Sequence, residues 1–181
     1  EPTLPSTLKA AGVEYIVVDD FHFIKSGLGR EELGGYYITE DQGSVIKVFP
    51  GSEALRYLIP FKPAAELAAH LKGLKGFLKR GNVAIYGDYG EKFGVWPGTD
   101  KWVFDDGWLE AFFQCIEEGS AWLRPMTFSE YMDGHEPLGR VYLPTTSYME
   151  MGGWTLPAAA ARAYDELIVE IKGWESGERV R

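Results

Sequence analysis

Two kinds of hydrophobic segment alternate along the chain. Short, nearly continuous apolar runs predict buried strands, because a strand covered on both faces shows no polar alternation. These predicted strands are Val13–Val18, Ser44–Pro50, Asn82–Tyr86 and Arg140–Pro144. Between them lie segments with helical patterns, most of them with apolar residues spaced three and four apart. These predicted helices are Leu8–Ala11, Pro63–Leu71, Gly107–Glu118, Thr127–Tyr131 and Pro157–Trp174.

This alternation predicts an α/β fold with a parallel sheet and a C-terminal helix. The sequence shows no repeat, linker or low-complexity segment, so we expect residues 1–181 to form a single domain. The chain opens at Glu1-Pro2 without a methionine, in a sequence that at once reads as the middle of a domain. We therefore expect a fragment of a longer domain, or a chain from which residues were removed.

The loop after the third predicted strand concentrates candidate chemistry. It begins at Asp88 and runs to Thr99, with Glu91 and Trp96 inside it. Acidic residues thus emerge where a buried strand gives way to a loop, and α/β barrels place their chemistry there because the strand is rigid and the loop is free to vary. The sequence predicts a polar site with an aromatic floor.

Composition supports that prediction. Hydrophobic residues make up 45% of the chain, as expected for a globular protein. Aromatic residues reach 14%, with six Trp and ten Tyr, which is more than a core of this size needs. Sugar-binding clefts use such a surplus, since pyranose rings present apolar faces to flat side chains; aromatic core packing is the alternative.

Charge and cysteine content exclude several classes of function. The formal net charge of −9 leaves no basic stripe for nucleic acid or for an anionic membrane surface. The sequence contains neither a run of 18 apolar residues nor a signal-peptide pattern. A single cysteine makes no internal disulfide, so we expect a reducing, cytoplasmic compartment. Cys115 lies on the apolar side of its predicted helix, which predicts a buried structural thiol.

We expect neither a metal nor a cofactor. The three histidines have no second ligand at a spacing that indicates zinc. Glycines 87, 90 and 94 do not form the G-x-G-x-x-G pattern of a dinucleotide-binding loop.

Four sequence blocks together resemble the catalytic barrel of glycoside hydrolase family 57, and within it the branch of 4-α-glucanotransferases and α-amylases. The most specific block runs from Gly90 through Thr99 and contains the string Glu-Lys-Phe-Gly-x-Trp-Pro, followed by Trp102 and 107–109. The other blocks are 18–23, 55–61 and 142–151. The resemblance covers about residues 1 to 160.

The resemblance implies a portion of a distorted (β/α) barrel with seven strands that acts on maltooligosaccharides or starch. It also implies a retaining mechanism with a glutamate nucleophile and an aspartate acid/base. In retaining enzymes these two carboxyl groups lie roughly 5–5.5 Å apart, so that one attacks the anomeric carbon while the other protonates the leaving oxygen.

The chain departs from the family pattern at its catalytic positions. Glu1-Pro2 resembles the end of the family's nucleophile motif, Glu-Arg-Val-Trp-Glu-Pro, so we expect the nucleophile just upstream of residue 1. The family's acid/base motif reads Asp-Asp-Gly-Glu-Lys-Phe-Gly, and its second Asp is catalytic; Tyr89 stands at that position here. Gly153 stands where a glutamate is expected.

Asp88 is the alternative acid, although adjacent strand residues point to opposite faces and its carboxylate would have to be redirected by a turn of the strand end. Tyr89, with an ordinary pKa near 10, is a poor acid for a glycosidic oxygen.

The resemblance places further residues at the substrate. It implies that Glu91 lines the cleft and Trp96 a sugar subsite, with a solvated pair to Lys92 and packing on the barrel rim as the alternatives. Asp20 and His22 end a buried strand and are expected to face the same mouth, unless Asp20 only caps the next helix. The fourth block adds Tyr148 as a substrate-binding residue. For Arg56, a structural pair is favoured over binding a sugar hydroxyl.

Two interpretations remain open. The chain is either the central part of an α-glucan-active enzyme, or a non-catalytic homologue or fragment with weak oligosaccharide binding or a role in assembly. Because about four strands of a parallel barrel leave two open edges, we expect a homo-oligomer or an open sheet rather than a closed barrel.

Overall fold

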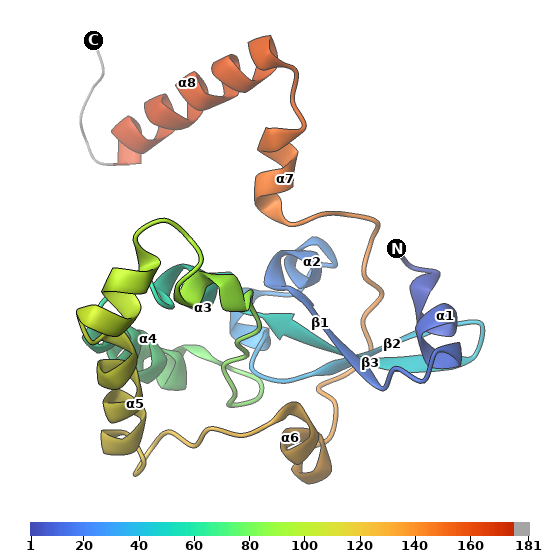
Figure 1. The fold of residues 1–181 in the computed structure, drawn as a ribbon. Helices are drawn as coiled ribbons and strands as arrows, with labels where there is room; N and C mark the ends of the chain where they lie inside the picture. Colours follow the sequence, from blue (N-terminus) through green and yellow to red (C-terminus); the bar gives the residue numbers. More distant parts are fainter. Residues whose placement is uncertain (176–181) are drawn as a thin grey trace. The chain divides into compact units, whose positions relative to one another are not determined.

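The computed structural model describes residues 1–175. They divide into two compact units, one from Glu1 to Thr145 and one that begins at Thr146, and each is described separately. The first unit contains α1 (Leu4–Ala10), β1 (Tyr15–Asp19), α2 (Asp20–Lys25), β2 (Tyr37–Asp41), β3 (Ser44–Gly51), α3 (Glu53–Leu58), α4 (Ala64–Phe77), α5 (Trp108–Glu118) and α6 (Phe128–Gly134) (Figure 1). Three tighter or wider helical turns complete it: 3₁₀ turns at Arg30–Glu32 and Gly90–Phe93, and a π-turn at Lys101–Asp105.

The sheet of the described residues has three strands in the order β1-β3-β2. β1 pairs in parallel with β3, as predicted, with Asp19 opposite Gly51 at their carboxyl ends. β2, which the sequence did not predict, pairs with β3 antiparallel, so an all-parallel sheet is wrong. Only Gln42 and Gly43 connect the two strands, and both have positive φ (49° and 79°). A two-residue turn of this kind joins antiparallel strands alone.

Two predicted strands form extended segments outside the three-stranded sheet. Asn82–Tyr86 makes two backbone hydrogen bonds, from Val83 N to Gly34 O (3.0 Å) and from Ser52 N to Ile85 O (2.9 Å). Arg140–Pro144 runs beside β2, where Val141 N donates to Ile38 O (2.9 Å). Both runs are apolar enough to be buried, but each finds too few backbone partners to form a ladder.

The second half of β3 is buried on both faces, whereas Val45 near its start is exposed. Ile46 and Val48 lie on one face in a core with Phe23, Tyr37 and Val141. Phe49 lies on the other face in a core with Tyr36, Ile85 and Tyr131. A third core joins α3, α4 and α5 through Leu55, Ile59, Leu67 and Trp108. In this half, the hydrophobic run of Ser44–Pro50 thus has the cause that the sequence indicated, burial on both sides.

The predicted helices at α1, α4, α5 and α6 are confirmed, with α1 starting earlier and α4 ending later than expected. α2 and α3 were not predicted, and both begin at strand ends. The side chain of Asp19 accepts from Phe21 N (3.0 Å) and the hydroxyl of Ser52 from Leu55 N (3.2 Å). These caps turn the chain into a helix as soon as β1 and β3 end.

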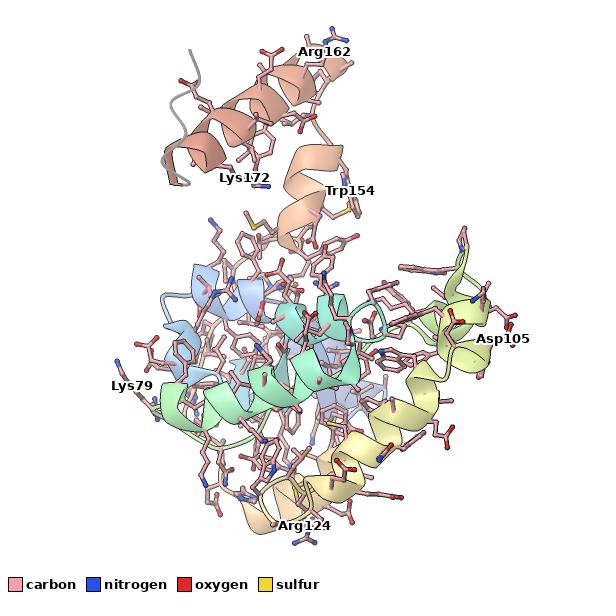
Figure 2. The ribbon with its side chains drawn as sticks, turned by 90° about the vertical axis from the view of Figure 1, so that its left-hand side faces the viewer. Lys79, Asp105, Arg124, Trp154, Arg162 and Lys172 are labelled. Atoms are coloured by element: carbon pink, nitrogen blue, oxygen red, sulfur yellow. The ribbon has the colours of Figure 1, made fainter. Side chains whose placement is uncertain are left out.

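The open sheet and its surrounding helices establish a mixed α/β architecture (Figure 1). A closed seven-stranded barrel is not formed by the described residues. The long loops between the helices are held by side chains; in Figure 2, for example, Lys79 lies past the end of α4, where its ammonium pairs with Glu31 (3.2 Å).

The second unit is helical. It contains α7 (Met149–Trp154) and α8 (Ala158–Glu175), which confirms the predicted C-terminal helix within one residue at each end. The hydroxyl of Thr155 donates to Met151 O (2.9 Å) where α7 ends. The prediction that residues 1–181 belong to one domain remains a prediction.

Candidate active site

Three loops meet at one edge of the sheet. β1 and β3 are parallel, so their carboxyl ends lie together and send out Asp19 and Ser52 side by side. Ser52 N also bonds to Ile85 O, which brings the segment before Asp88 to the same edge. Gly87 lies close to the Val17 side chain of β1, since a methyl group at this glycine would come within 3.3 Å of it. The structure therefore gathers these loops where the sequence predicted the chemistry.

The first charged contact at this edge joins Asp19 to Arg56. One guanidinium nitrogen of Arg56 lies 2.5 Å from the Asp19 carboxylate, and both side chains are largely buried. The structural pair that the sequence favoured for Arg56 is thus present. Its Nε atom is buried and has no hydrogen-bond partner.

Asp20, next along the chain, is 6% exposed. One of its carboxylate oxygens accepts from Glu53 N (3.3 Å) and Arg30 (3.5 Å), while the other is buried without a partner. Burial raises the pKa of the Asp20 carboxyl above its ordinary value, and the Asp19 carboxylate adds to the rise; the Glu53 N–H and the two arginines oppose it. Asp20 therefore caps α3, rather than the helix that follows it in sequence.

The second charged contact joins Asp88 to Lys92. The Lys92 ammonium forms a short contact with one Asp88 oxygen and donates to Arg56 O (2.7 Å). The other Asp88 oxygen accepts from Tyr89 N (2.8 Å). Both side chains are almost completely buried, so Asp88 has no oxygen directed freely at a substrate. Lys92 pairs with Asp88, not with Glu91 as the sequence-based alternative had it.

Two aromatic rings stand over this ion pair. The rings of Phe61 and Trp96 are stacked with centroids 5.9 Å apart, and the Lys92 ammonium lies 5.2 Å and 5.7 Å from their centroids. Trp96 is 41% exposed and Phe61 38% exposed. The Thr99 hydroxyl donates to Trp96 O (2.7 Å), which fixes the loop beneath the indole.

Tyr89 and Glu91 lie on the surface of the same loop. Tyr89 is 65% exposed, and Glu91 is also exposed. Tyr86, before them, has a buried hydroxyl without a partner. Burial raises the pKa of the Tyr86 phenol well above its ordinary value, and the Asp88 carboxylate adds to the rise. The Tyr86 phenol is therefore not a ready proton donor near neutral pH.

The remaining predicted residues differ in their placement. His22 lies within α2 and its Nδ1 atom is 3.1 Å from Asp19 O, so it belongs to the same edge. Tyr148 precedes α7 in the second unit, where its ring contacts that of Trp154 at 5.8 Å. The part assigned to Tyr148 in substrate binding stays a prediction.

Sequence reasoning missed Phe61 and the burial of Lys92. A lysine inside a polar motif reads as solvated, yet its spacing of four from Asp88 is the spacing at which opposite charges meet on a helical turn. Phe61 lies in one of the blocks that carry the family resemblance, but nothing near it in sequence indicates that its ring contacts that of Trp96.

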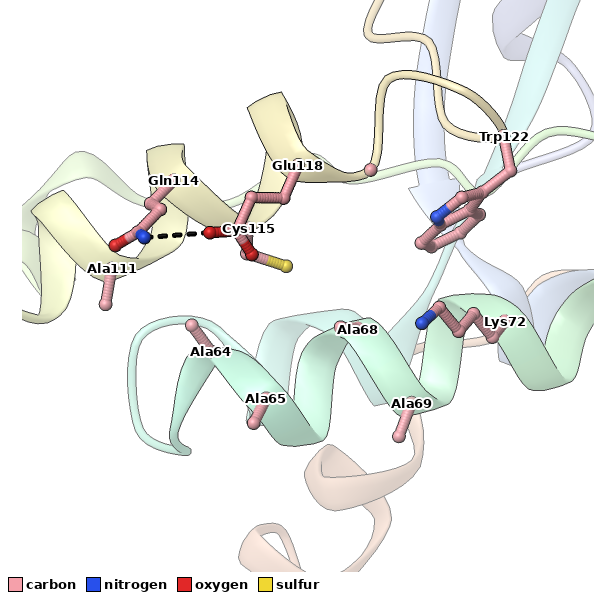
Figure 3. A pocket seen from close by; sticks show the side chains of 11 residues that line it. Ala64, Ala65, Ala68, Ala69, Lys72, Ala111, Gln114, Cys115, Glu118 and Trp122 are labelled. Atoms are coloured by element: carbon pink, nitrogen blue, oxygen red, sulfur yellow. Dashed lines mark hydrogen bonds between the residues drawn. The ribbon is translucent and has the colours of Figure 1, made fainter.

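Two cavities of the first unit lie elsewhere. One, of about 630 Å³, is a groove between α4 and α5 lined by alanines, with Lys72 below Trp122 and a Gln114–Glu118 hydrogen bond (Figure 3). The other, of about 790 Å³, lies between the Phe49 face of the sheet, α5 and α6. Cys115 borders both cavities and is only partly buried, which differs from the predicted buried structural thiol. Neither cavity is lined by the charged residues of the edge, Asp19, Arg56, Asp88 and Lys92.

Within residues 1–175, no group of three or more His, Cys, Asp or Glu is arranged to hold a metal ion. No helix in this part of the chain is long and apolar enough to cross a membrane.

Comparison with known proteins supplies a context for this edge. The sequence model of glycosyl hydrolase family 57 matches residues 1–144. A 4-alpha-glucanotransferase of Thermococcus litoralis is 46% identical over all 181 residues, and an alpha-amylase of Pyrococcus furiosus is 46% identical over 172 residues, or 95% of the chain. The chain covers 27% and 26% of these relatives, about a quarter of their length.

A solved structure agrees with the sequence comparison. The crystal structure of the 4-alpha-glucanotransferase from Thermococcus litoralis superposes with a TM-score of 0.85 at 46% identity. The superposition covers 98% of this chain and 27% of that one.

Proposed function

Because the chain belongs to glycosyl hydrolase family 57, we propose that it forms one wall of an α-glucan site that serves hydrolysis or transfer of maltooligosaccharide units. One observation carries the proposal: carboxylates, cations and two exposed rings converge at the carboxyl edge of β1 and β3. Sugar sites combine an apolar surface for the ring with a few polar groups that fix the hydroxyls. This edge offers both.

The proposed contacts follow from exposure. Trp96 presents its ring to a glucose unit, and Glu91 is placed on the same loop to accept from a hydroxyl. Asp20 and His22 belong to α2, which follows β1, although Asp20 has only its unpartnered oxygen to offer. Tyr148 is a further proposed contact, on the strength of its sequence block alone.

This surface lacks a free carboxyl group at the acid/base position. Tyr89 takes the place of the family's catalytic aspartate and is exposed, while Asp88 is engaged through both oxygens. A general acid must hold a proton within hydrogen-bond reach of the leaving oxygen. We therefore expect the turnover of maltooligosaccharides by this chain to be undetectable.

That expectation supports a second candidate function. The chain would be a non-catalytic homologue that retains the glucan-binding surface, or a part with a structural or assembly role. The Asp88–Lys92 contact favours it, because this contact commits the nearest carboxylate to the fold.

The two candidates are separated by activity measurements on the longest natural polypeptide that contains this chain. Maltoheptaose is incubated with the wild type, with Asp88→Asn and with Tyr89→Asp, and the products are separated by chromatography. If the chain is inactive because Tyr89 replaces the acid/base aspartate, the wild type shows no turnover and Tyr89→Asp gains it. Turnover by the wild type that Asp88→Asn abolishes would establish Asp88 as the acid and an active enzyme. If the wild type neither turns over nor binds any maltooligosaccharide, the α-glucan proposal is wrong.

We also propose that the outer edge of β1 pairs with another copy of the chain, since β1 ends the sheet of the described residues. Light scattering that gives the mass of a monomer would contradict this.

A further inference from the structure

Lys92 is unusual because it is a buried lysine, with only 5% of its surface exposed. Lysines are almost never buried unless they are paired, because an ammonium loses its hydration on burial. The Lys92 ammonium has the Asp88 carboxylate, the Arg56 carbonyl oxygen and two aromatic rings around it. It is therefore fully compensated, by partners from two parts of the chain: Asp88 and Trp96 from its own loop, and Arg56 and Phe61 from α3 and the segment after it.

The two rings near Lys92 belong to separate segments. Phe61 follows α3, and the carbonyl oxygen of its neighbour Pro60 accepts from the Trp102 indole (2.6 Å). Trp96 follows the turn of Gly90–Phe93, and its backbone N–H donates to Glu91 O (3.2 Å). Fixed backbones on both sides bring the rings into a stacked pair, with an angle of 26° between their planes.

A stacked pair that is itself more than a third exposed leaves a flat apolar surface in contact with water. The ammonium lies within about 6 Å of both ring centroids, the range in which a cation is attracted by the negative face of a ring. The buried cation is thus close to both rings at once, while each ring keeps more than a third of its surface exposed to solvent.

We propose that Phe61 and Trp96 form one joint surface for the apolar face of a glucose unit, with Phe61 as a substrate-contacting residue and Lys92 as the positioning residue that orients both rings. The inference rests on the α-glucan function proposed above. It adds a second ring to the single tryptophan that the sequence indicated. It also gives the buried ion pair a purpose beyond stability, because the same ammonium connects Asp88, Arg56 and the rings.

The test for Phe61 uses Phe61→Leu, which keeps an apolar side chain of similar size but removes the flat ring. Affinity for maltotriose and longer maltooligosaccharides is measured by calorimetry, in the longest natural polypeptide that contains the chain. We expect about a tenfold loss of affinity. Phe77→Leu is the matched control, since Phe77 is also exposed but lies at the end of α4, and it should leave affinity unchanged.

The test for Lys92 compares Asp88→Asn with the double variant Asp88→Asn, Lys92→Met. The single variant keeps the cation beneath the rings, whereas the double variant removes both charges and so leaves no unpaired charge in the core. The protein is labelled with 5-fluorotryptophan, and the ¹⁹F signal of Trp96 is assigned with Trp96→Phe. We expect the double variant alone to shift the Trp96 signal and to lose affinity as Phe61→Leu does.

The outcomes separate this inference from the function beneath it. If the wild type binds maltooligosaccharides and Phe61→Leu binds them equally well, the joint surface is wrong while the α-glucan function stands. If the double variant keeps both the Trp96 signal and the affinity of Asp88→Asn, Lys92 does not position the rings. If the wild type binds no maltooligosaccharide, the proposed function and this inference both fall.

Discussion

The loops that follow β1 and the Asn82–Tyr86 segment open in the same way and end differently. Each begins with an aspartate that binds a cation: Asp19 pairs with Arg56 of α3, and Asp88 with Lys92 of its own loop. The two cations are themselves joined, because Lys92 donates to the carbonyl oxygen of Arg56. The first carboxylate of each loop is thus used to hold the edge together.

The second residue of each loop shows the difference. Asp20 is 6% exposed and caps α3, whereas Tyr89 is 65% exposed and has no such task. Both first residues turn inward to a cation, but only in the 88–99 loop does the second residue face water; Asp20 is held in the interior by its bond from Glu53 N. Under the proposed function, this is the position of the family's acid/base, and here it holds a tyrosine.

Of the changes to these two loops, removal of the Lys92 charge is expected to lower the free energy of unfolding most. Lys92→Met leaves the Asp88 carboxylate buried without its cation, and we expect a loss of about 3–5 kcal/mol in the free energy of unfolding. Chemical denaturation measures it. Adding Asp88→Asn should recover much of the loss, because no charge then remains unpaired. Lys101→Met, which breaks an exposed pair with Asp106, serves as the control and should change little. A loss no larger than that of the control would contradict the structural role of the pair.

Removing the Arg56 charge is expected to cost less. The guanidinium is about a fifth exposed, and Asp19 keeps its bond from Phe21 N, so Arg56→Met should lower the free energy of unfolding by about 2 kcal/mol. Arg30→Met, at a more exposed pair, should cost under about 1 kcal/mol. Equal losses at the two arginines would show that burial does not distinguish these contacts.

The smallest expected effect is a dependence on pH at Asp20. Its carboxyl has a raised pKa in the folded protein, because burial disfavours the charged form. The folded state therefore retains the proton to higher pH than the unfolded state does. The wild type gains stability from this group as pH falls through the folded pKa, and the gain is complete below the unfolded value of 3.8. Asp20→Asn lacks this gain.

The measurement is the difference in unfolding free energy between Asp20→Asn and the wild type, followed from neutral pH to about pH 4. The stability of the Asn variant relative to the wild type should decrease steadily as the pH is lowered. Asp133→Asn, on the exposed side of α6, should show no such trend. If the stability of Asp20→Asn relative to the wild type instead rises as the pH is lowered, the Asp20 pKa is lowered in the folded protein and this account is wrong.

The sequence located the loop edge well, because the signal was local. An apolar run that gives way to Asp88 predicts a strand followed by a polar loop. The cap of the helix after β1 was considered for Asp20, whereas the structure has Asp19 in that role. β2 escaped prediction because Thr39, Glu40 and Asp41 make it look like a loop, and only pairing with β3 stabilises it. Such pairing is a property of the fold and cannot be read from the segment itself.

The ion pairs could not be predicted for the same reason. Arg56 and Asp19 are 37 positions apart, and the contact of Lys92 with Arg56 O spans 36. The stacked rings are 35 residues apart by their numbers, 61 and 96. Sequence patterns identified Trp96 as an aromatic residue at the site, but its partner ring and the cation beneath both depend on how the loops converge.

The most direct measurement for the central claim is a titration of the protein with maltotriose, followed through the indole signals of the tryptophans by NMR. Signals are assigned with Trp96→Ala and Trp154→Ala; Trp154 lies in α7 and is exposed, so it serves as the control. If the charged edge binds α-glucan, the Trp96 signal moves with a dissociation constant of about 1 mM while that of Trp154 stays in place, and Trp96→Ala abolishes binding. A Trp96 signal that stays unmoved at tens of millimolar maltotriose would contradict the assignment of this edge to an α-glucan.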